Sequence, residues 1–150
     1  MAVESTKYTN ANYNAYRGNI SDLGDAGTEI KVALMADSFT FNKETDDNWE
    51  DISAHEIDPA ENPPYEAGGK AISNPSFSTT GDLAVFDGDN TSWESANISA
   101  RYAVIYDATP AEDADKKLIA VIDFLEQKQT TDGTFELQWD NSGIFAIEAL

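Results

Sequence analysis

Apolar and polar residues alternate along much of the chain from Thr28 onward, and this period of two predicts β-strands. The clearest strand covers 96–106. Near-continuous apolar residues over 118–125 predict a central strand covered on both faces. Further strands are predicted over 30–36, 70–73, 76–79, 83–86, 134–139 and 144–147. One face of the strand 96–106 is predicted to hold Ile98, Ala100, Tyr102, Val104 and Tyr106.

Turn-forming residues separate these strands. Asp87–Asn90, the polar stretch 127–133 and a hairpin turn at 141–143 are predicted turns, and the Pro- and Gly-rich stretch 55–69 is a predicted long loop. A short helical turn is predicted over 46–52 with Asp46 as its N-cap. Short strands separated by turns, without a long helix, predict an all-β fold. We expect a single antiparallel β-sandwich or barrel-like domain over 28–150.

The N-terminal segment, residues 1–27, has a different character. It is rich in Asn, Ser, Thr, Asp and Gly and follows neither a strand nor a helix period throughout. A short helix is compatible with it, because Tyr13, Tyr16, Ile20 and Leu23 would lie on roughly one helical face. We interpret it as an irregular N-terminal arm, either a frayed terminus or a segment that folds on a partner. As an arm it could be deleted without unfolding the domain. Its candidate partner-binding residues are the apolar and aromatic ones: Tyr8, Tyr13, Tyr16, Ile20 and Leu23.

The charge changes the picture of possible partners. Asp and Glu number 28 against 9 Lys and Arg, which gives a formal net charge of −19, and there is no cysteine. Because a chain this acidic repels phosphate backbones and anionic lipids, we expect no nucleic-acid partner. No apolar run approaches the length of about 20 residues that a membrane-spanning helix needs, so we expect no membrane partner. The acidity itself indicates either colloidal solubility or a cationic patch on a partner.

No combination of residues singles out a catalytic, cofactor or metal site. His55 is the only histidine, and no serine lies in a nucleophile motif, so His55 is interpreted as a surface-loop residue. Asp87–Asn90 could offer oxygens to calcium but lacks the EF-hand spacing. Adjacent carboxylates could support glycoside hydrolysis, yet in so acidic a chain such pairs arise by chance. These pairs are Asp46 with Asp47, Glu50 with Asp51, Asp87 with Asp89, and Asp113 with Asp115.

Several short stretches resemble small structural proteins of tailed-bacteriophage particles. They are 30–34, 49–54, 65–70, Trp93, 98–107, 122–124, 135–139 and 143–144, and the likeness extends over about 28–147. The resemblance implies a non-enzymatic virion protein, most simply a decoration (cement) protein on the outer surface of the head that is assembled in the host cytoplasm. It also implies that the chain contacts the major capsid protein and forms a homotrimer on the particle. The strong acidity and the N-terminal arm depart from the resemblance and could mark this chain's own partner.

Two other functions remain open at this point. A tail, baseplate or host-surface-binding module would bind sugars through exposed tryptophans, for which Trp49, Trp93 and Trp139 are the candidates, although core or anchoring roles are favoured for them. A carbohydrate-active enzyme would depend on one indispensable carboxylate pair, and nothing in the sequence selects one.

Overall fold

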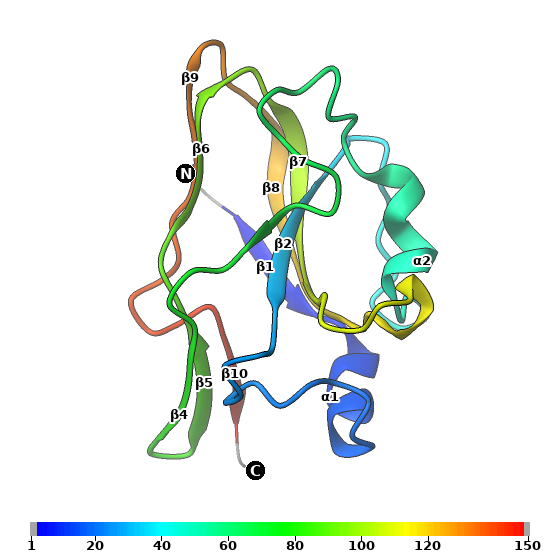
Figure 1. The fold of residues 1–150 in the computed structure, drawn as a ribbon, viewed down its shortest axis with the longest axis vertical. Helices are drawn as coiled ribbons and strands as arrows, with labels where there is room; N and C mark the ends of the chain where they lie inside the picture. The colour runs from blue at the N-terminus through cyan, green and yellow to red at the C-terminus, as the bar shows by residue number, and fades with distance from the viewer. Residues whose placement is uncertain (1–2, 149–150) are drawn as a thin grey trace.

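The computed structural model describes residues 3–148 and places a five-stranded antiparallel sheet at its centre (Figure 1). Its strands, in spatial order, are β1 (Glu4–Lys7), β8 (Leu118–Gln129), β7 (Ser99–Asp107), β2 (Ile30–Met35) and β3 (Lys70–Ala71). Beside one face lie two smaller antiparallel sheets. One has the order β10 (Phe145–Glu148), β5 (Leu83–Asp87), β4 (Ser76–Thr80), and the other pairs β6 (Thr91–Ala96) with β9 (Gly133–Leu137). The predicted all-β, sandwich-like fold is confirmed.

The opposite face of the central sheet is covered by helical turns and loops. These are α1 (Thr9–Tyr16), α2 (Trp49–Ile52) and two 3-10 turns, Ser53–His55 and Asp113–Asp115. Figure 1 shows both helices on the side of the central sheet away from β4, β5, β6 and β9.

Alternation along β2 divides the core in two. Ile30, Val32 and Leu34 pack with the small sheets, whereas Ala33 and Met35 pack on the helical side. Successive side chains of a strand point to opposite faces, so β2 contributes residues to both core clusters, one on each face of the central sheet. The predicted central strand over 118–125 behaves in the same way. Leu118 packs on the helical side and Ile119 packs on the other.

An irregularity between β7 and β8 corrects the predicted face of the strand 96–106. Ala100 pairs with Lys128 but Tyr102 pairs with Asp123, so β8 carries extra residues at this point. Such a bulge bends the ladder and increases its local twist. On the two sides of it, Ile98 and Ala100 share a cluster with Ala103 and Ile105, whereas Tyr102, Val104 and Tyr106 belong to the helical side. The Asp123 carboxylate supports the bulge, because its Oδ1 accepts hydrogen bonds from Leu125 N–H at 2.7 Å and from Arg101 Nε at 3.2 Å.

Four other local predictions need correction. β6 was not predicted, and β8 runs to Gln129 through part of the predicted turn 127–133. The residues 141–143 form a turn but not a hairpin, because β9 pairs with β6 and β10 pairs with β5. The N-cap of α2 is Asn48, which forms a capping box with Asp51, rather than Asp46.

The N-terminal segment contains a strand that the sequence did not predict and a short helix that it allowed. β1 pairs along its whole length with β8, and the Tyr8 N–H donates to the Ile119 carbonyl at 3.0 Å. α1 follows at once and ends at Tyr16, where Arg17 caps it and Gly18 takes a φ of 75°. The chain then runs irregularly to β2. In this structure residues 4–16 are therefore part of the domain, while a role as an arm on a partner stays a prediction.

Candidate partner-binding surface

α1 is held to the core by its inner side. Tyr8, just before the helix, is 1% exposed, and Ala11 is buried beside it in the cluster that contains Leu118 and Val121. The helix has no side-chain N-cap and is rich in asparagine, which is a weak helix former. An eight-residue helix of this kind is not stable on its own, so packing on β8 must hold it.

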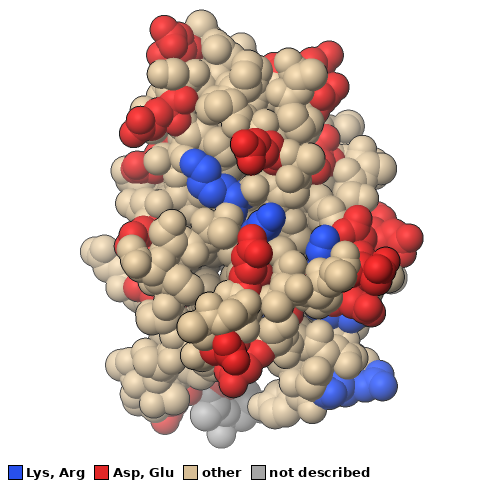
Figure 2. All heavy atoms as spheres, viewed as in Figure 1, with Lys and Arg blue, Asp and Glu red and all other residues tan. Residues whose placement is uncertain are grey.

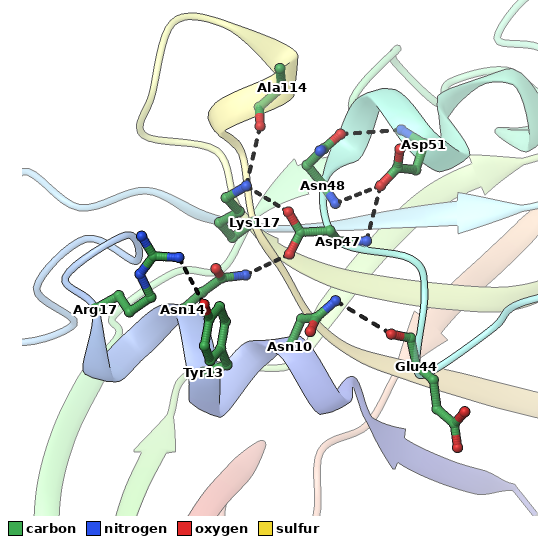
Figure 3. A network of polar contacts seen from close by, with 10 residues as sticks. All are labelled: Asn10, Tyr13, Asn14, Arg17, Glu44, Asp47, Asn48, Asp51, Ala114 and Lys117. Atoms are coloured by element: carbon green, nitrogen blue, oxygen red, sulfur yellow. Dashed lines mark hydrogen bonds and ion pairs between the residues drawn. The ribbon is translucent and has the colours of Figure 1, made fainter.

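A polar network fixes α1 to two neighbouring segments (Figure 3). The buried Asn14 donates to Asp47 Oδ1 at 2.7 Å, and Lys117 Nζ donates to Asp47 Oδ2 at 2.7 Å. Burial alone would raise the pKa of Asp47. Hydrogen bonds from Lys117 and Asn14, together with the Lys117 charge, outweigh burial and hold that pKa below its usual range. Helix α1, the loop before α2 and the start of β8 are thereby joined at one carboxylate.

The outer side of α1 carries exposed aromatic residues. Tyr13 is 57% exposed and Tyr16 is 88% exposed. The Arg17 guanidinium lies 5.2 Å from the Tyr13 ring centroid and donates to Tyr13 Oη at 2.9 Å, a cation–π arrangement that orders both side chains. Tyr13, Tyr16 and Arg17 are called the aromatic surface below.

The segment that carries the aromatic surface has no acidic residue of its own. No Asp or Glu occurs between Ser5 and Ser21, whereas Lys7 and Arg17 do, in a chain of net charge −19. Figure 2 shows Lys and Arg atoms at the lower right, where Figure 1 places α1, below a group of acidic atoms. Tyr and Arg are enriched where proteins bind each other, and acidic residues are depleted there.

The five predicted partner-binding residues separate into three groups by their exposure. Tyr13 and Tyr16 are accessible, as a contact requires, and their binding role stays a prediction. Tyr8 is not accessible, because it fills the core beneath α1. Ile20 and Leu23 are half-buried and line a small apolar cavity of about 30 Å³ with Ala11, Ala15 and residues of β10. The helix ends before Ile20, so these residues do not share one helical face with the tyrosines.

A second polar network shapes the loop 56–69. The Tyr65 hydroxyl donates to Glu56 Oε1 at 2.6 Å and accepts from the Leu34 N–H at 3.0 Å. The Gly68 N–H also donates to Glu56 Oε1 at 2.6 Å, and the Tyr106 hydroxyl donates to the Gly68 carbonyl at 2.6 Å. Burial raises the pKa of Glu56 above its usual value despite these hydrogen bonds. The predicted loop is thus confirmed, and buried polar contacts hold it in place.

The tryptophans fall mostly in the core. Trp49 is buried and stacks on Tyr106 with ring centroids 4.5 Å apart, and Trp93 is buried beside Tyr65. Trp139 is half-buried and donates from Nε1 to the Asp89 carbonyl at 2.9 Å. It lines a groove of about 410 Å³ whose other walls include Phe124, Leu137 and Gln138. Of the three candidate sugar-binding tryptophans, Trp139 is the least buried and borders this groove, whereas the buried Trp93 borders a second one.

A second groove of about 410 Å³ has mixed charge. It is lined by Lys31 and Lys70 together with Glu29, Glu66 and Glu94, and Lys70 lies over the ring of Trp93. Figure 2 shows the Lys and Arg atoms near the middle of this face interspersed with acidic atoms. Opposite charges so close together largely cancel, so the groove does not select a charged ligand of either sign.

His55 and several of the acidic residues considered for catalysis or metal binding make contacts that serve the fold. His55 is exposed at the end of a 3-10 turn, with its ring centroid 5.8 Å from that of Phe39. Asp47 and Asp51 are engaged in the network around α1 and in the capping box, and Asp87 accepts from the Gly88 N–H. Within residues 3–148, no three His, Cys, Asp or Glu side chains are grouped closely enough to hold a metal ion.

Two features of this surface were missed from the sequence. Arg17 was not named with the tyrosines, although the acid-free stretch around it can be read directly from the sequence. The hydrogen-bond network of Asn14, Asp47 and Lys117 could not be predicted from the sequence, because these residues come together only through the fold.

Comparisons with known proteins give no relative for this chain. No family model matches it, and no curated protein or solved structure is significantly similar to it. None of the described helices is long and apolar enough to cross a membrane.

Proposed function

We propose that this chain is a structural protein of a tailed-phage particle, a decoration protein on the outer head surface, and that the aromatic surface of α1 contacts the major capsid protein. The observation that carries the contact is the exposure of Tyr13 and Tyr16 on a firmly anchored helix free of acidic residues. The placement on the head rests on the resemblance of the sequence to small virion proteins.

The surface has the physical properties that such a contact requires. Tyrosine and arginine side chains supply large contact areas and often dominate binding energy. The network at Asp47 holds α1 in place before binding, so little backbone order has to be gained on association. A shell then multiplies each modest contact by its symmetry.

Reconstitution on heads that lack this chain tests the proposal. Purified protein is mixed with such heads, and the bound amount is measured against the major capsid protein by gel densitometry. We expect a copy number comparable to that of the capsid protein. Tyr16→Ala should weaken binding by about tenfold, the loss expected for a contact residue worth about 1.4 kcal/mol. Arg17→Glu should weaken it further, since it also introduces an acid into the contact.

Lys128→Glu is the matched control for Arg17→Glu. It makes the same change of charge near the far end of β8, where Lys128 pairs with Glu126 at the surface. It should bind like the unaltered chain. Failure of the unaltered chain to bind heads, or equal losses in both charge variants, would refute the proposed contact.

A host-surface-binding tail module is the second candidate function, and the groove beside Trp139 is the observation that favours it. It predicts a copy number of a few per cent of the capsid protein and binding to glycans of the host surface. Tyr16→Ala should then leave that binding unchanged, whereas Trp139→Ala should abolish it.

A further inference from the structure

The strand β4 forms an open edge. It pairs with β5 through five consecutive residue pairs, with no bulge, and has no strand partner on its other side among the described residues. All five of its residues are exposed. In Figure 1, β4 lies on the side of the molecule opposite the helices, so a chain bound there would leave the aromatic surface of α1 free.

Charged residues, prolines, bulges and very short strands discourage pairing of such an edge with another chain. The five residues of β4 have none of these features, and Pro75 lies just before the strand. The other strands at sheet edges have these features: β1, β6, β9 and β10 each contain a charged residue, β6 is bulged, and β3 has only two residues, one of them Lys70. In contrast, no residue from Ala71 to Gly81 is charged, although the chain as a whole carries a net charge of −19.

An aromatic row leads to this edge and ends there. Phe145 of β10 pairs with Phe86 of β5, which in turn pairs with Phe77 of β4. Phe86 and Phe145 stack with ring centroids 4.9 Å apart, and Phe86 is buried. Phe77 is 37% exposed, because no further strand covers it.

From these features we infer that β4 pairs antiparallel with β4 of a second copy of this chain. A two-fold axis at Ser78 gives a self-complementary register, with Phe77 opposite Thr79 and Ser76 opposite Thr80 of the partner. Aromatic and β-branched residues form favourable cross-strand pairs, and the two Phe77 side chains would lie diagonally across the seam. The pairing continues the three-stranded sheet into a six-stranded one. It also lets two strongly acidic molecules meet where neither presents an acidic residue in the paired strand.

This contact does not rest on the proposed function, and the purified full-length chain tests it. Light scattering after size-exclusion chromatography gives the molar mass over a series of concentrations up to millimolar. A one-strand contact is small, so we expect a mass that rises with concentration from 16.3 kDa toward twice that value. A mass that stays at the monomer value throughout would overturn the inference, even if β4 then bound an extended segment of another protein.

Charge variants at the two-fold axis locate the contact. In Ser78→Lys and Ser78→Glu, identical charges would face each other across the axis, and each variant alone should remain a monomer. An equimolar mixture of the two should recover the dimer, because the charges then attract. Thr40→Lys and Thr40→Glu are matched controls at an exposed loop position and should dimerise like the unaltered chain. Dimers that persist in both Ser78 variants, or a mixture that stays monomeric, would overturn the inference.

Discussion

Replacing Tyr8 tests whether the N-terminal segment is part of the folded domain. The Tyr8 side chain is 1% exposed and packs in the helical-side cluster, where Trp49 also lies. Truncating a buried aromatic residue to alanine removes its apolar burial and leaves a cavity, a loss of about 3–5 kcal/mol. Tyr8→Ala should therefore lower the free energy of unfolding by that amount, and the midpoint of thermal unfolding by on the order of 10 °C.

Two further variants separate the possible contributions. Tyr16, which is 88% exposed, is the matched control, and Tyr16→Ala should change stability by less than about 0.5 kcal/mol. Tyr8→Phe removes only a hydroxyl that is buried without a hydrogen-bond partner, and the pKa of Tyr8 is raised by that burial and by the nearby Asp46. A buried hydroxyl without a partner costs about 1–3 kcal/mol. Tyr8→Phe should therefore be at least as stable as the unaltered chain.

Urea unfolding followed by tryptophan fluorescence is the appropriate measurement, because Trp49 shares a cluster with Tyr8. If Tyr8→Ala behaves like Tyr16→Ala, residues 4–16 contribute little to the domain and act as the removable arm that the sequence first indicated. A loss of 3–5 kcal/mol would instead mean that deleting this segment destabilises the domain severely.

Two other variants test the core and the loop network. Val104→Asp should unfold the domain, because Val104 is fully buried in β7 and an unpaired buried charge costs several kcal/mol. A soluble variant whose circular dichroism spectrum matches that of the unaltered chain would contradict this prediction. Glu56→Gln should become more stable relative to the unaltered chain as the pH rises from about 4 to about 7. In the unaltered chain the pKa of Glu56 is raised by folding, so protonated Glu56 favours the folded state. This stabilisation is fully present below the pKa of Glu56 in the unfolded chain, and it is lost as the pH rises through the pKa of Glu56 in the folded chain. Gln keeps the acceptor oxygen used by Tyr65 and Gly68 but cannot ionise, so an equal response of both proteins to pH in urea unfolding would contradict this reasoning.

The strands of the central sheet could be read from the sequence because burial on both faces leaves a strong local signal. β2 and the start of β8 are nearly continuous in apolar residues, and both lie where they were expected. β6 was missed because its sequence, from Thr91 to Ala96, is short and polar at several positions, and it becomes a strand only by pairing with β9. The same holds for β1, whose pairing with β8 cannot be seen in its own residues.

The errors within correctly predicted strands have a single physical origin. A local pattern assumes a regular ladder, whereas the ladder is bulged beside Ala100, and Ile98 and Ala100 pack in a different cluster from Val104. Leu125 lies in the extra residues of β8 with a φ of 67°, a backbone conformation that is uncommon for leucine and is not indicated by any local pattern. For the candidate surface, Tyr13 and Tyr16 are exposed, as a contact requires, and their binding role stays a prediction. Burial of Tyr8 depended on the path of β1, which the sequence did not reveal.

The acidity of the chain and its two proposed contacts are connected. At physiological ionic strength the screening length is about 8 Å, so fixed charges matter mainly where surfaces come close together. Most approaches between this molecule and an acidic or neutral surface bring carboxylates into the contact and must dehydrate or neutralise them. The outer side of α1 and the strand β4 avoid this cost, because neither carries an acidic residue, and both present exposed aromatic residues. Acidity would then act less as an attraction to a partner than as a selection among contacts, since it disfavours association at carboxylate-rich surfaces more than at these two.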